Sequence, residues 1–276
     1  ELRQYDTDVR ETPADIYDNT YAPIHYSLFD QPKQNIIAYE CNDMNTIGRL
    51  EEYGRKAILL DIGCGLGSHL KQFSKIAPKM TLFGLDQSED MLTFAQQKID
   101  DSSQIRFIQG DMNESNIVHE KMFTHITCYS FTLYYADDIK TFFENTHKWL
   151  KTGGHLCVHV VDPALFNPVP LVANPIRGIP LQKYMKKRKT DTTVYFQSFL
   201  YESDFEYNEE DDTAKLHESI IYPKKEYVRK HTHDYNMPPK DSIVQTARQV
   251  GFKLRHITHM KDMGIDHEYL CYFQKR

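Results

Sequence analysis

The chain has 276 residues, which is enough for one or two domains, and an ordinary globular composition with 40% apolar and 26% charged residues. This composition excludes disorder throughout the chain. The formal net charge is −6, from 33 Lys and Arg against 39 Asp and Glu, whereas a nucleic-acid-binding domain normally carries a basic surface. The charge therefore argues against a large DNA or RNA partner, and no apolar stretch reaches the roughly 20 residues that span a bilayer.

The cysteines and the N-terminus bear on the compartment. The number of cysteines, five, is odd, and none of them forms a Cys-x-x-Cys pair. The sequence therefore predicts neither a disulfide framework nor a cysteine zinc site. The first residues are polar and show no signal peptide. Both observations favour a reducing, cytoplasmic location.

Helix and strand patterns alternate in the first part of the chain. Residues 13–53 are predicted to be helical, with interruptions at Pro23 and Pro32. The predicted strands that follow are 57–62, 80–85, 104–109, 123–130 and 156–161. The predicted helices between them are 69–77, 88–99 and 137–150, and Ser88 is the expected N-cap of the second. Apolar strands separated by helices predict a parallel sheet covered on both faces, with a ligand crevice at the C-terminal strand ends.

Beyond residue 162 the pattern changes. Five prolines predict loop over 163–180. Strands are predicted over 192–201 and 215–222, separated by an acidic turn at 202–212, and we expect the two strands to pair as an antiparallel excursion. A helix over 238–250, which ends at Gly251, and two strands over 252–259 and 269–274 are predicted to close the fold.

The strongest motif is a strand that runs into Asp61-Ile62-Gly63-Cys64-Gly65-Leu66-Gly67. Its glycines allow a tight turn and the close approach of a ligand beside the free N–H groups of the next helix. The spacing differs from the Gly-x-Gly-x-x-Gly of dinucleotide sites.

Asp86 ends the second strand 19 residues after Gly67, near the offset at which an acid meets ribose hydroxyls. The alternative for Asp86 is a helix cap beside Ser88. Asp111 ends the third strand, where it can accept a hydrogen bond from an amine such as that of adenine. The three acids at consecutive strand ends are predicted to face one crevice.

These residues resemble the class I S-adenosylmethionine-dependent methyltransferases. The resemblance covers about residues 57–162 and includes Gly110-Asp111-Met112, the run Trp149-Leu150-Lys151-Thr152-Gly153-Gly154 and, near the end, Gly251-Phe252. It implies an α/β fold, a Rossmann-like three-layer sandwich with a mostly parallel seven-stranded sheet, and S-adenosylmethionine as the cofactor. It places the methionine part of the cofactor at Asp61 and the glycine turn, the ribose at Asp86, and the adenine between Asp111 and Met112. The cofactor-binding set that it implies is Tyr17, Tyr21, Asp61, Gly63, Gly65, Gly67, Asp86, Gln87, Asp111, Met112, Tyr129 and Ser130.

Within this class, the chain is similar to small-molecule methyltransferases of the glycine and amino-sugar N-methyltransferase type. The likeness rests on an N-terminal helix with Tyr17 and Tyr21, on Asp162-Pro163 after the fifth strand, and on the antiparallel excursion before the last helix. The two tyrosines either cap the site as part of a lid or anchor the N-terminal helix to the sheet. The predicted division is a helical lid (1–56), a cofactor-binding core (57–162), a substrate-side excursion (163–235), and the last helix with the closing strands (236–276).

Few catalytic residues are expected, because methyl transfer from a sulfonium depends mainly on positioning and needs a base only when the nucleophile arrives protonated. The candidates are Asp162, His159 and Tyr134. Asp162 either holds a substrate amine or hydroxyl or forms the turn before Pro163. His159 is either a base or a buried, hydrogen-bonded histidine. Tyr134 follows the fourth strand, where the class has its substrate edge.

The remaining histidines bear on metal binding, and the basic run bears on anion binding. No metal site is predicted, because His231, His233, His256 and His259 lack a third ligand. The basic run Lys183–Lys189 is either a solvated surface or a clamp on phosphate or carboxylate groups.

The expected function is methyl transfer to an amine or hydroxyl of a small polar molecule such as a sugar, nucleotide-sugar or amino-acid derivative. The alternatives are a nucleic-acid or protein methyltransferase, and a cofactor-binding module without turnover. The oligomeric state is not predicted.

Overall fold

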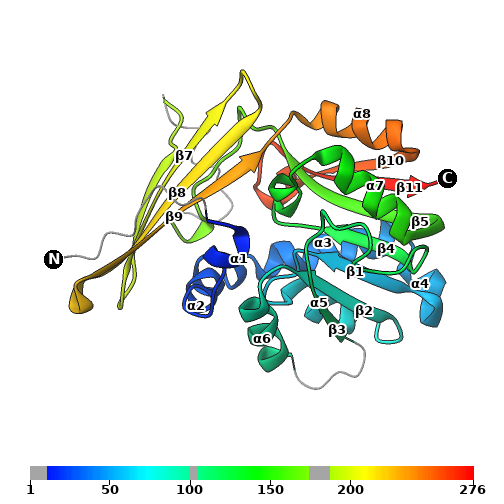
Figure 1. The fold of residues 1–276 in the computed structure, drawn as a ribbon, viewed down its shortest axis with the longest axis horizontal. Coiled ribbons are helices and arrows are strands. Elements are labelled where there is room, and N and C mark those ends of the chain that lie inside the picture. Colours follow the sequence, from blue (N-terminus) through cyan, green and yellow to red (C-terminus); the bar gives the residue numbers. More distant parts are fainter. Residues whose placement is uncertain (1–10, 100–104, 174–186) are drawn as a thin grey trace.

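A computed structural model gives the fold of residues 11–99, 105–173 and 187–276, which contain two sheets (Figure 1). The larger sheet has seven strands in the order β10-β11-β5-β4-β1-β2-β3. They are β1 (Ile58–Ile62), β2 (Thr81–Asp86), β3 (Ile105–Gln109), β4 (Phe123–Cys128), β5 (Leu150–Val161), β10 (Phe252–His259) and β11 (Glu268–Lys275). Strands β1 to β5 are parallel to one another, and β11 runs antiparallel to both β5 and β10. The predicted, mostly parallel seven-stranded sheet is confirmed.

Helices cover both faces of this sheet. One apolar cluster joins Leu59 of β1 to α3 (Gln34–Ile47), α5 (Ser68–Ile76) and α6 (Glu89–Lys98). A second cluster joins Leu60 of β1 to α7 (Ile139–Trp149) and α8 (Lys240–Val250). Successive strand residues thus face opposite layers, as a sheet buried on both sides requires, and the Rossmann-like three-layer arrangement is confirmed. In the described ranges, none of the helices combines the length and the apolarity needed to cross a bilayer.

Helix ends mostly follow the sequence signals. Ser88 is the N-cap of α6, and its Oγ accepts a hydrogen bond from the backbone N–H of Met91 at 3.1 Å. Gly251 ends α8 with a left-handed φ of 110°. The predicted start of the fifth strand at residue 156 was wrong, because β5 already begins at Leu150, opposite Phe123. Gly153, with φ of 81°, lets the strand bend where an end was expected.

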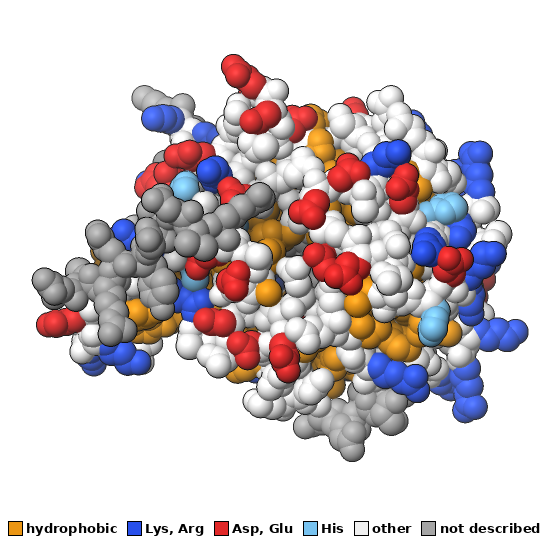
Figure 2. Space-filling view, in the orientation of Figure 1, with side chains coloured by type: hydrophobic (Ala, Val, Ile, Leu, Met, Phe, Trp, Pro, Cys, Tyr) orange, Lys and Arg blue, Asp and Glu red, His pale blue; other side chains and the backbone are white. Residues whose placement is uncertain are grey.

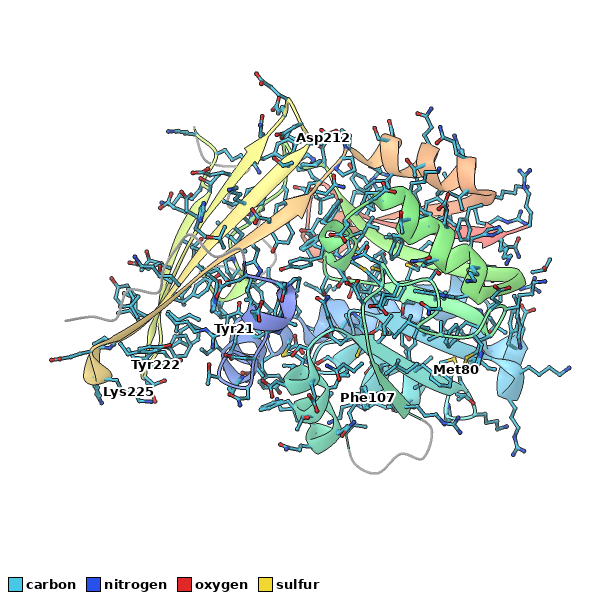
Figure 3. All side chains as sticks on the ribbon, in the orientation of Figure 1. Tyr21, Met80, Phe107, Asp212, Tyr222 and Lys225 are labelled. Carbon is cyan, nitrogen blue, oxygen red and sulfur yellow. The ribbon has the colours of Figure 1, made fainter. Side chains whose placement is uncertain are left out.

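The second sheet has four antiparallel strands, β6 (Asp191–Tyr195), β7 (Leu200–Asn208), β8 (Thr213–Tyr222) and β9 (Tyr227–Asn236). The antiparallel excursion is therefore confirmed, although β9 was not predicted. Its strands reach well away from the core (Figure 1), and Tyr222 and Lys225 lie at the far end of the β8–β9 hairpin (Figure 3). Asp212 lies at the opposite end of β8, and its backbone carbonyl accepts a hydrogen bond from Met237 just before α8.

Two predicted boundaries in this sheet were wrong. The expected single strand over 192–201 turns back between Phe196 and Phe199, whose backbone groups are hydrogen-bonded at 2.9 Å. The expected acidic turn at 202–212 is largely part of β7. Along β7, Tyr201, Ser203 and Phe205 are buried. The alternate residues Glu202, Asp204 and Glu206 are exposed, so the acids are the solvent-facing half of an amphipathic strand.

Of the N-terminal helices, α1 (Pro13–Ile16) and α2 (Ala22–His25) lie between the second sheet and the core (Figure 1). A π-helical turn (Tyr26–Asp30) follows α2, and α3 and α4 (Leu50–Tyr53) pack against the core. Pro23 does not interrupt a helix as predicted. It lies in the first turn of α2, where a missing N–H costs nothing, and the break falls at residues 17–21.

One buried carboxylate, that of Glu218 on β8, joins these parts. Its oxygens accept hydrogen bonds from Tyr21 (2.8 Å), from His233 of β9 (2.7 Å) and from Tyr201 of β7. The other ring nitrogen of His233 lies 2.6 Å from the hydroxyl of Tyr135 in the core. Tyr21 stands between the N-terminal helices and the long strands (Figure 3). Burial alone would raise the pKa of Glu218, but the charge and hydrogen bond of His233 lower it to about 2.

We expect Glu218→Ala to lower the free energy of unfolding at pH 7 by about 3–5 kcal/mol, because it leaves three buried groups without their acceptor. The pKa is depressed from 4.5, so this stabilisation is present above pH 4.5 and is lost as the pH falls toward 2. Urea denaturation at several pH values measures it. Glu206→Ala on the exposed face of β7 is the control and should change stability by no more than about 0.5 kcal/mol. Equal effects of the two variants would contradict the role of Glu218.

Candidate active site

A cavity of about 1040 Å³ lies where the C-terminal ends of the parallel strands meet the second sheet and the N-terminal helices. The glycine turn after β1, the loop after β4 and the end of β5 contribute to its wall from the core. Tyr17 and Tyr21 line it from the N-terminal segment, and Glu218 and His233 from the second sheet. Figure 2 shows acidic side chains gathered on this face of the molecule around an apolar hollow between the second sheet and the core.

The glycine turn is shaped by its neighbours as well as by its own flexibility. Gly63, Gly65 and Gly67 all have positive φ angles, of 65°, 50° and 72°. A Cβ on Gly63 would lie 2.2 Å from Cγ2 of Thr132, so no larger residue fits there. A Cβ on Gly65 would meet only the methyl end of Met91, at 3.6 Å. The turn is therefore packed tightly at Gly63 and is open at Gly65, which lines the cavity, whereas Gly67 does not line it.

Asp86 joins the end of β2 to this turn. Its Oδ2 accepts a hydrogen bond from the Gly65 N–H at 2.7 Å, and its Oδ1 accepts one from the Ser88 N–H at 3.0 Å. The helix cap itself is Ser88. A carboxylate has about four acceptor positions, so two remain for a ligand in the cavity that Asp86 lines. Burial raises the pKa of Asp86, although the backbone N–H groups of Ser88 and Gly65 act in the opposite direction.

Asp111, Gln87 and Met112 lie together beside Asp86 in the cavity wall. Oδ2 of Asp111 accepts a hydrogen bond from Gln87 at 3.0 Å, and its Oδ1 accepts one from the Asn113 N–H at 2.8 Å. Met112 is 8% exposed and offers an apolar surface. A carboxylate beside an apolar side chain suits a flat, amine-bearing ring, so the geometry agrees with the requirements of adenine.

Some predicted cofactor residues lie behind the wall. Asp61 is 2% exposed and does not line the cavity, and its Oδ1 accepts a hydrogen bond from Thr127 Oγ1 at 2.7 Å. Tyr129 is also buried and stacks on His69 with ring centroids 4.4 Å apart. Ser130 does line the cavity, and both it and Phe131 have left-handed φ angles, 49° and 66°. Two such residues in succession mark the loop after β4 as strained, which is common at functional sites.

The three catalytic candidates lie in different environments. His159 lines the cavity and contacts two carboxylates, as described below. Tyr134 also lines it, but its hydroxyl accepts a hydrogen bond from the Val161 N–H at 2.8 Å and so holds the loop to β5. Asp162 does not line the cavity, and its backbone N–H donates to the His267 carbonyl at 2.8 Å.

The basic run lies only partly within the described residues. Lys183 and Lys186 lie outside them. Arg188 donates hydrogen bonds to the carbonyls of Pro163, Ala164 and Phe166. Its guanidinium therefore holds the loop after β5, and these donors are not free to bind an anion.

Sequence reasoning missed several cavity residues. Glu40 of α3, His69 of α5 and Glu268 of β11 all line the cavity and are at most 9% exposed. Burial opposes the charged forms of Glu40 and His69. Their mutual hydrogen bond of 2.8 Å nevertheless lowers the pKa of Glu40 and raises that of His69. His69 could have been noticed from its place two residues after Gly67, whereas Glu40 and Glu268 carry no local motif. Within the described residues, no cluster of three or more metal-binding side chains has a geometry that could hold an ion.

Comparisons with known proteins agree with this geometry. Residues 59–154 match the family described as "Methyltransferase domain". The chain is 33% identical over 99 residues to the dTDP-3-amino-3,4,6-trideoxy-alpha-D-glucopyranose N,N-dimethyltransferase of Streptomyces venezuelae, covering 36% of this chain and 39% of that protein. The chain spans between 20% and 56% of the length of the curated relatives that it matches.

Two solved structures share the fold over almost the whole chain. The CcbJ methyltransferase from Streptomyces caelestis has a TM-score of 0.67 and 14% identity, with 98% of this chain and 99% of that chain covered. The S-adenosylmethionine-bound CalS10, an amino pentose methyltransferase from Micromonospora echinaspora, has a TM-score of 0.59 and 17% identity, with 87% and 92% covered.

The chain has the fold of S-adenosylmethionine-dependent methyltransferases of known structure. Residues 59–154 are its methyltransferase domain. The resemblance of the sequence to this class is therefore confirmed.

We expect Asp86→Ala to weaken binding of S-adenosylmethionine by about 1–3 kcal/mol, because the Gly65 N–H and, if the predicted ribose assignment holds, the ribose hydroxyls would lose their acceptor. Isothermal titration calorimetry measures the affinity. Glu89→Ala is the matched control, since Glu89 is exposed in the first turn of α6 and does not line the cavity. An unchanged affinity in Asp86→Ala would remove the ribose assignment.

Asp61 gives a pH-dependent prediction. Burial raises the pKa of Asp61 from 3.8 to about 6, against the opposing effects of the charge of His69 and the Thr127 hydrogen bond. The folded state then holds a proton that the unfolded state has lost, so stability falls as the pH rises from about 4 to about 6. Asp61→Asn removes this dependence and should gain about 1–3 kcal/mol relative to the wild type across that interval. Urea denaturation from pH 4 to 8 measures the gain, and a difference that does not vary with pH would contradict the buried carboxylate.

Proposed function

We propose that the protein transfers a methyl group from S-adenosylmethionine to an amine or hydroxyl of a small polar molecule. One observation carries the proposal: the glycine turn, Asp86 and Asp111 open into the same cavity that the second sheet and the N-terminal helices close from the other side. A ligand held at the turn therefore faces a bounded space. Such an enclosed space suits a compact acceptor better than a polymer, which needs an open groove.

The residues suggest a division of roles around the cofactor. Asp86 would hold the ribose, Asp111 with Gln87 and Met112 would hold the adenine, and the N–H groups at Gly63 and Gly65 would border the methionine part. Asp61, Gly67 and Tyr129 would support this surface from behind. The bound cofactor supplies a methyl group made electrophilic by a sulfonium, and the protein's contribution is to position the acceptor and exclude water.

The segments outside the core would supply the acceptor side. Tyr17 and Tyr21 from the predicted lid (1–56) and Glu218 and His233 from the predicted excursion (163–235) all line the cavity. We assign the cofactor to the core segment 57–162, whose fold the last helix and the closing strands (236–276) complete. A sugar, nucleotide-sugar or amino-acid derivative is the preferred acceptor class. Support comes from the Streptomyces venezuelae relative and from CalS10, whose names describe amino-sugar and amino-pentose methyltransferases.

Charge and cysteine chemistry support the rest of the assignment. The chain carries a net charge of −6, and the partly buried Arg188 is occupied by backbone carbonyls, so a nucleic-acid substrate is disfavoured. All five cysteines are buried free thiols, which suits the reducing cytoplasm.

A labelled-methyl assay tests the function. The purified protein is incubated with methyl-labelled S-adenosylmethionine and, separately, with small-molecule, RNA and protein fractions of a cell extract. We expect label in the small-molecule fraction and at least a fivefold loss at limiting cofactor in Asp86→Ala, because that variant binds the cofactor less well. Label confined to RNA or protein would reject the small acceptor. Cofactor binding without label in any fraction would indicate a cofactor-binding module without turnover.

A further inference from the structure

Part of the cavity wall is a buried array of two carboxylates and an imidazole. His159 of β5 lies between Glu40 of α3 and Glu268 of β11, and all three line the cavity. Their exposed fractions are 3%, 2% and 8%. Three elements far apart in the chain thus bring their ionisable groups to one point. Phe131, from the loop after β4, packs against the imidazole with ring centroids 4.8 Å apart.

The hydrogen bonds of the array define the proton positions on His159. Nε2 of His159 lies 3.0 Å from Oε2 of Glu268. A carboxylate only accepts hydrogen bonds, so Nε2 carries a proton and donates it. Nδ1, in contrast, has no hydrogen-bond partner among the described residues. In the neutral tautomer with its proton on Nε2, Nδ1 carries a lone pair that can accept a hydrogen bond.

A carboxylate oxygen, which is also an acceptor, lies close to Nδ1. Oε1 of Glu40 lies 3.4 Å from Nδ1 without a hydrogen bond between them, while Oε2 of Glu40 is held by His69. Glu40 is kept ionised by this contact, since His69 holds its pKa below the ordinary value against the effect of burial. A buried nitrogen without a hydrogen-bond partner is costly, and Nδ1 of His159 is such an atom beside a carboxylate. A ligand with two N–H groups and a positive charge would satisfy both.

The wider cavity also favours a cation. Of the described residues that line it, ten are Asp or Glu and only two, Lys33 and Arg188, are Lys or Arg. Arg188 is already bound to backbone carbonyls. A phosphate-bearing or carboxylate-bearing group would meet a negative field here, whereas an ammonium would be attracted.

We propose that Glu40, His159 and Glu268 form the acceptor subsite and that the acceptor is an amine that arrives as an ammonium ion. The proposal rests on the proposed function and specifies nitrogen as the methylated atom. The ammonium donates one N–H to Oε1 of Glu40 and another to Nδ1 of His159. Glu268 is a positioning residue, which fixes the imidazole through Nε2 and stabilises its protonated form.

Methyl transfer from the cofactor to the ammonium nitrogen requires one proton transfer and one displacement at carbon. The ammonium gives one proton to Nδ1 of His159, which becomes an imidazolium between two carboxylates. The freed nitrogen lone pair forms a bond to the methyl carbon, the carbon–sulfur bond breaks with its electron pair on sulfur, and the product is a methylated ammonium beside a neutral thioether. A hydroxyl acceptor has one O–H and no positive charge, so it would leave one acceptor unsatisfied.

Chemical blocking of amines tests the acceptor class directly. The small-molecule extract is treated with acetic anhydride in mildly alkaline buffer, which acylates amines in preference to hydroxyls, and a control portion receives prehydrolysed reagent. We expect the labelled product to fall at least tenfold in the treated portion only. Label that survives acylation would overturn the amine assignment and leave methyl transfer intact. No labelled small molecule from the control portion would reject the proposed function, and with it this inference.

Variants of the array test the residue assignments, with the active extract fraction as the probe. His159→Asn should lower kcat at least 100-fold, the scale of general-base catalysis. Glu268→Gln should lower kcat about tenfold with KM unchanged, because the amide oxygen still accepts from Nε2 but lacks the charge. Glu40→Gln should mainly raise KM for the acceptor. His155→Gln is the matched control, since His155 lies on the same strand and does not line the cavity.

The array could bind either the ammonium of the acceptor or the ammonium of the cofactor's methionine part. The affinity for S-adenosylhomocysteine, measured by calorimetry on the same variants, distinguishes the two. We expect it to stay within twofold of the wild type, which also shows that each variant is folded. A loss of tenfold or more in all three array variants, with melting temperatures unchanged, would show that the array binds the ammonium of the cofactor itself. That result, or an unchanged kcat and KM in His159→Asn, would overturn the proposal.

Discussion

The cavity exists because a single buried carboxylate holds three parts of the chain in one place. Glu218 accepts hydrogen bonds from Tyr21 of the N-terminal segment and from Tyr201 and His233 of the second sheet. The other ring nitrogen of His233 is hydrogen-bonded to the hydroxyl of Tyr135 in the core. The apolar face of a sheet must pack against another element, so the position of the second sheet depends on what it contacts at its base. The second sheet and the core are thus built separately, and the Glu218 cluster holds them together around the cavity.

The sequence predicted the core well, because each part of the core is encoded locally. Apolar strands, Ser88 as an N-cap and Gly251 as a helix end all act within a few residues, and the structure has them where they were expected. The second sheet was harder. The acids of β7 resemble a turn until the partner face is known, since Glu202, Asp204 and Glu206 alternate with buried residues only in the paired strand. Strand β9 was missed because its alternation is carried by charged and histidine side chains whose burial comes from the Glu218 cluster.

The candidate site divides in the same way. Asp86 and Asp111 could be found from the sequence, since an acid at a strand end after a glycine turn is a local pattern, and both line the cavity. Glu40 and Glu268 could not, because they meet only through His159, and Glu40 and Glu268 are 228 positions apart in the chain. Asp162 illustrates the opposite case. Its motif with Pro163 is local and clear, yet the strand end turns so that its backbone pairs with His267 and its side chain lies outside the cavity wall.

The two buried carboxylate systems differ in one physical respect, and the difference separates structure from function. Glu218 has three donors around its two oxygens, so its desolvation is compensated within the protein and it needs no ligand. Glu40 has one such donor, and its second oxygen faces the unpaired Nδ1 of His159. A fold gains nothing from leaving the buried Nδ1 of His159 without a hydrogen bond, and natural proteins accept such a cost mainly at sites that bind something. The incomplete hydrogen bonding of the His159 array, rather than its charge or its burial, is therefore what marks this part of the cavity as the place where the acceptor binds.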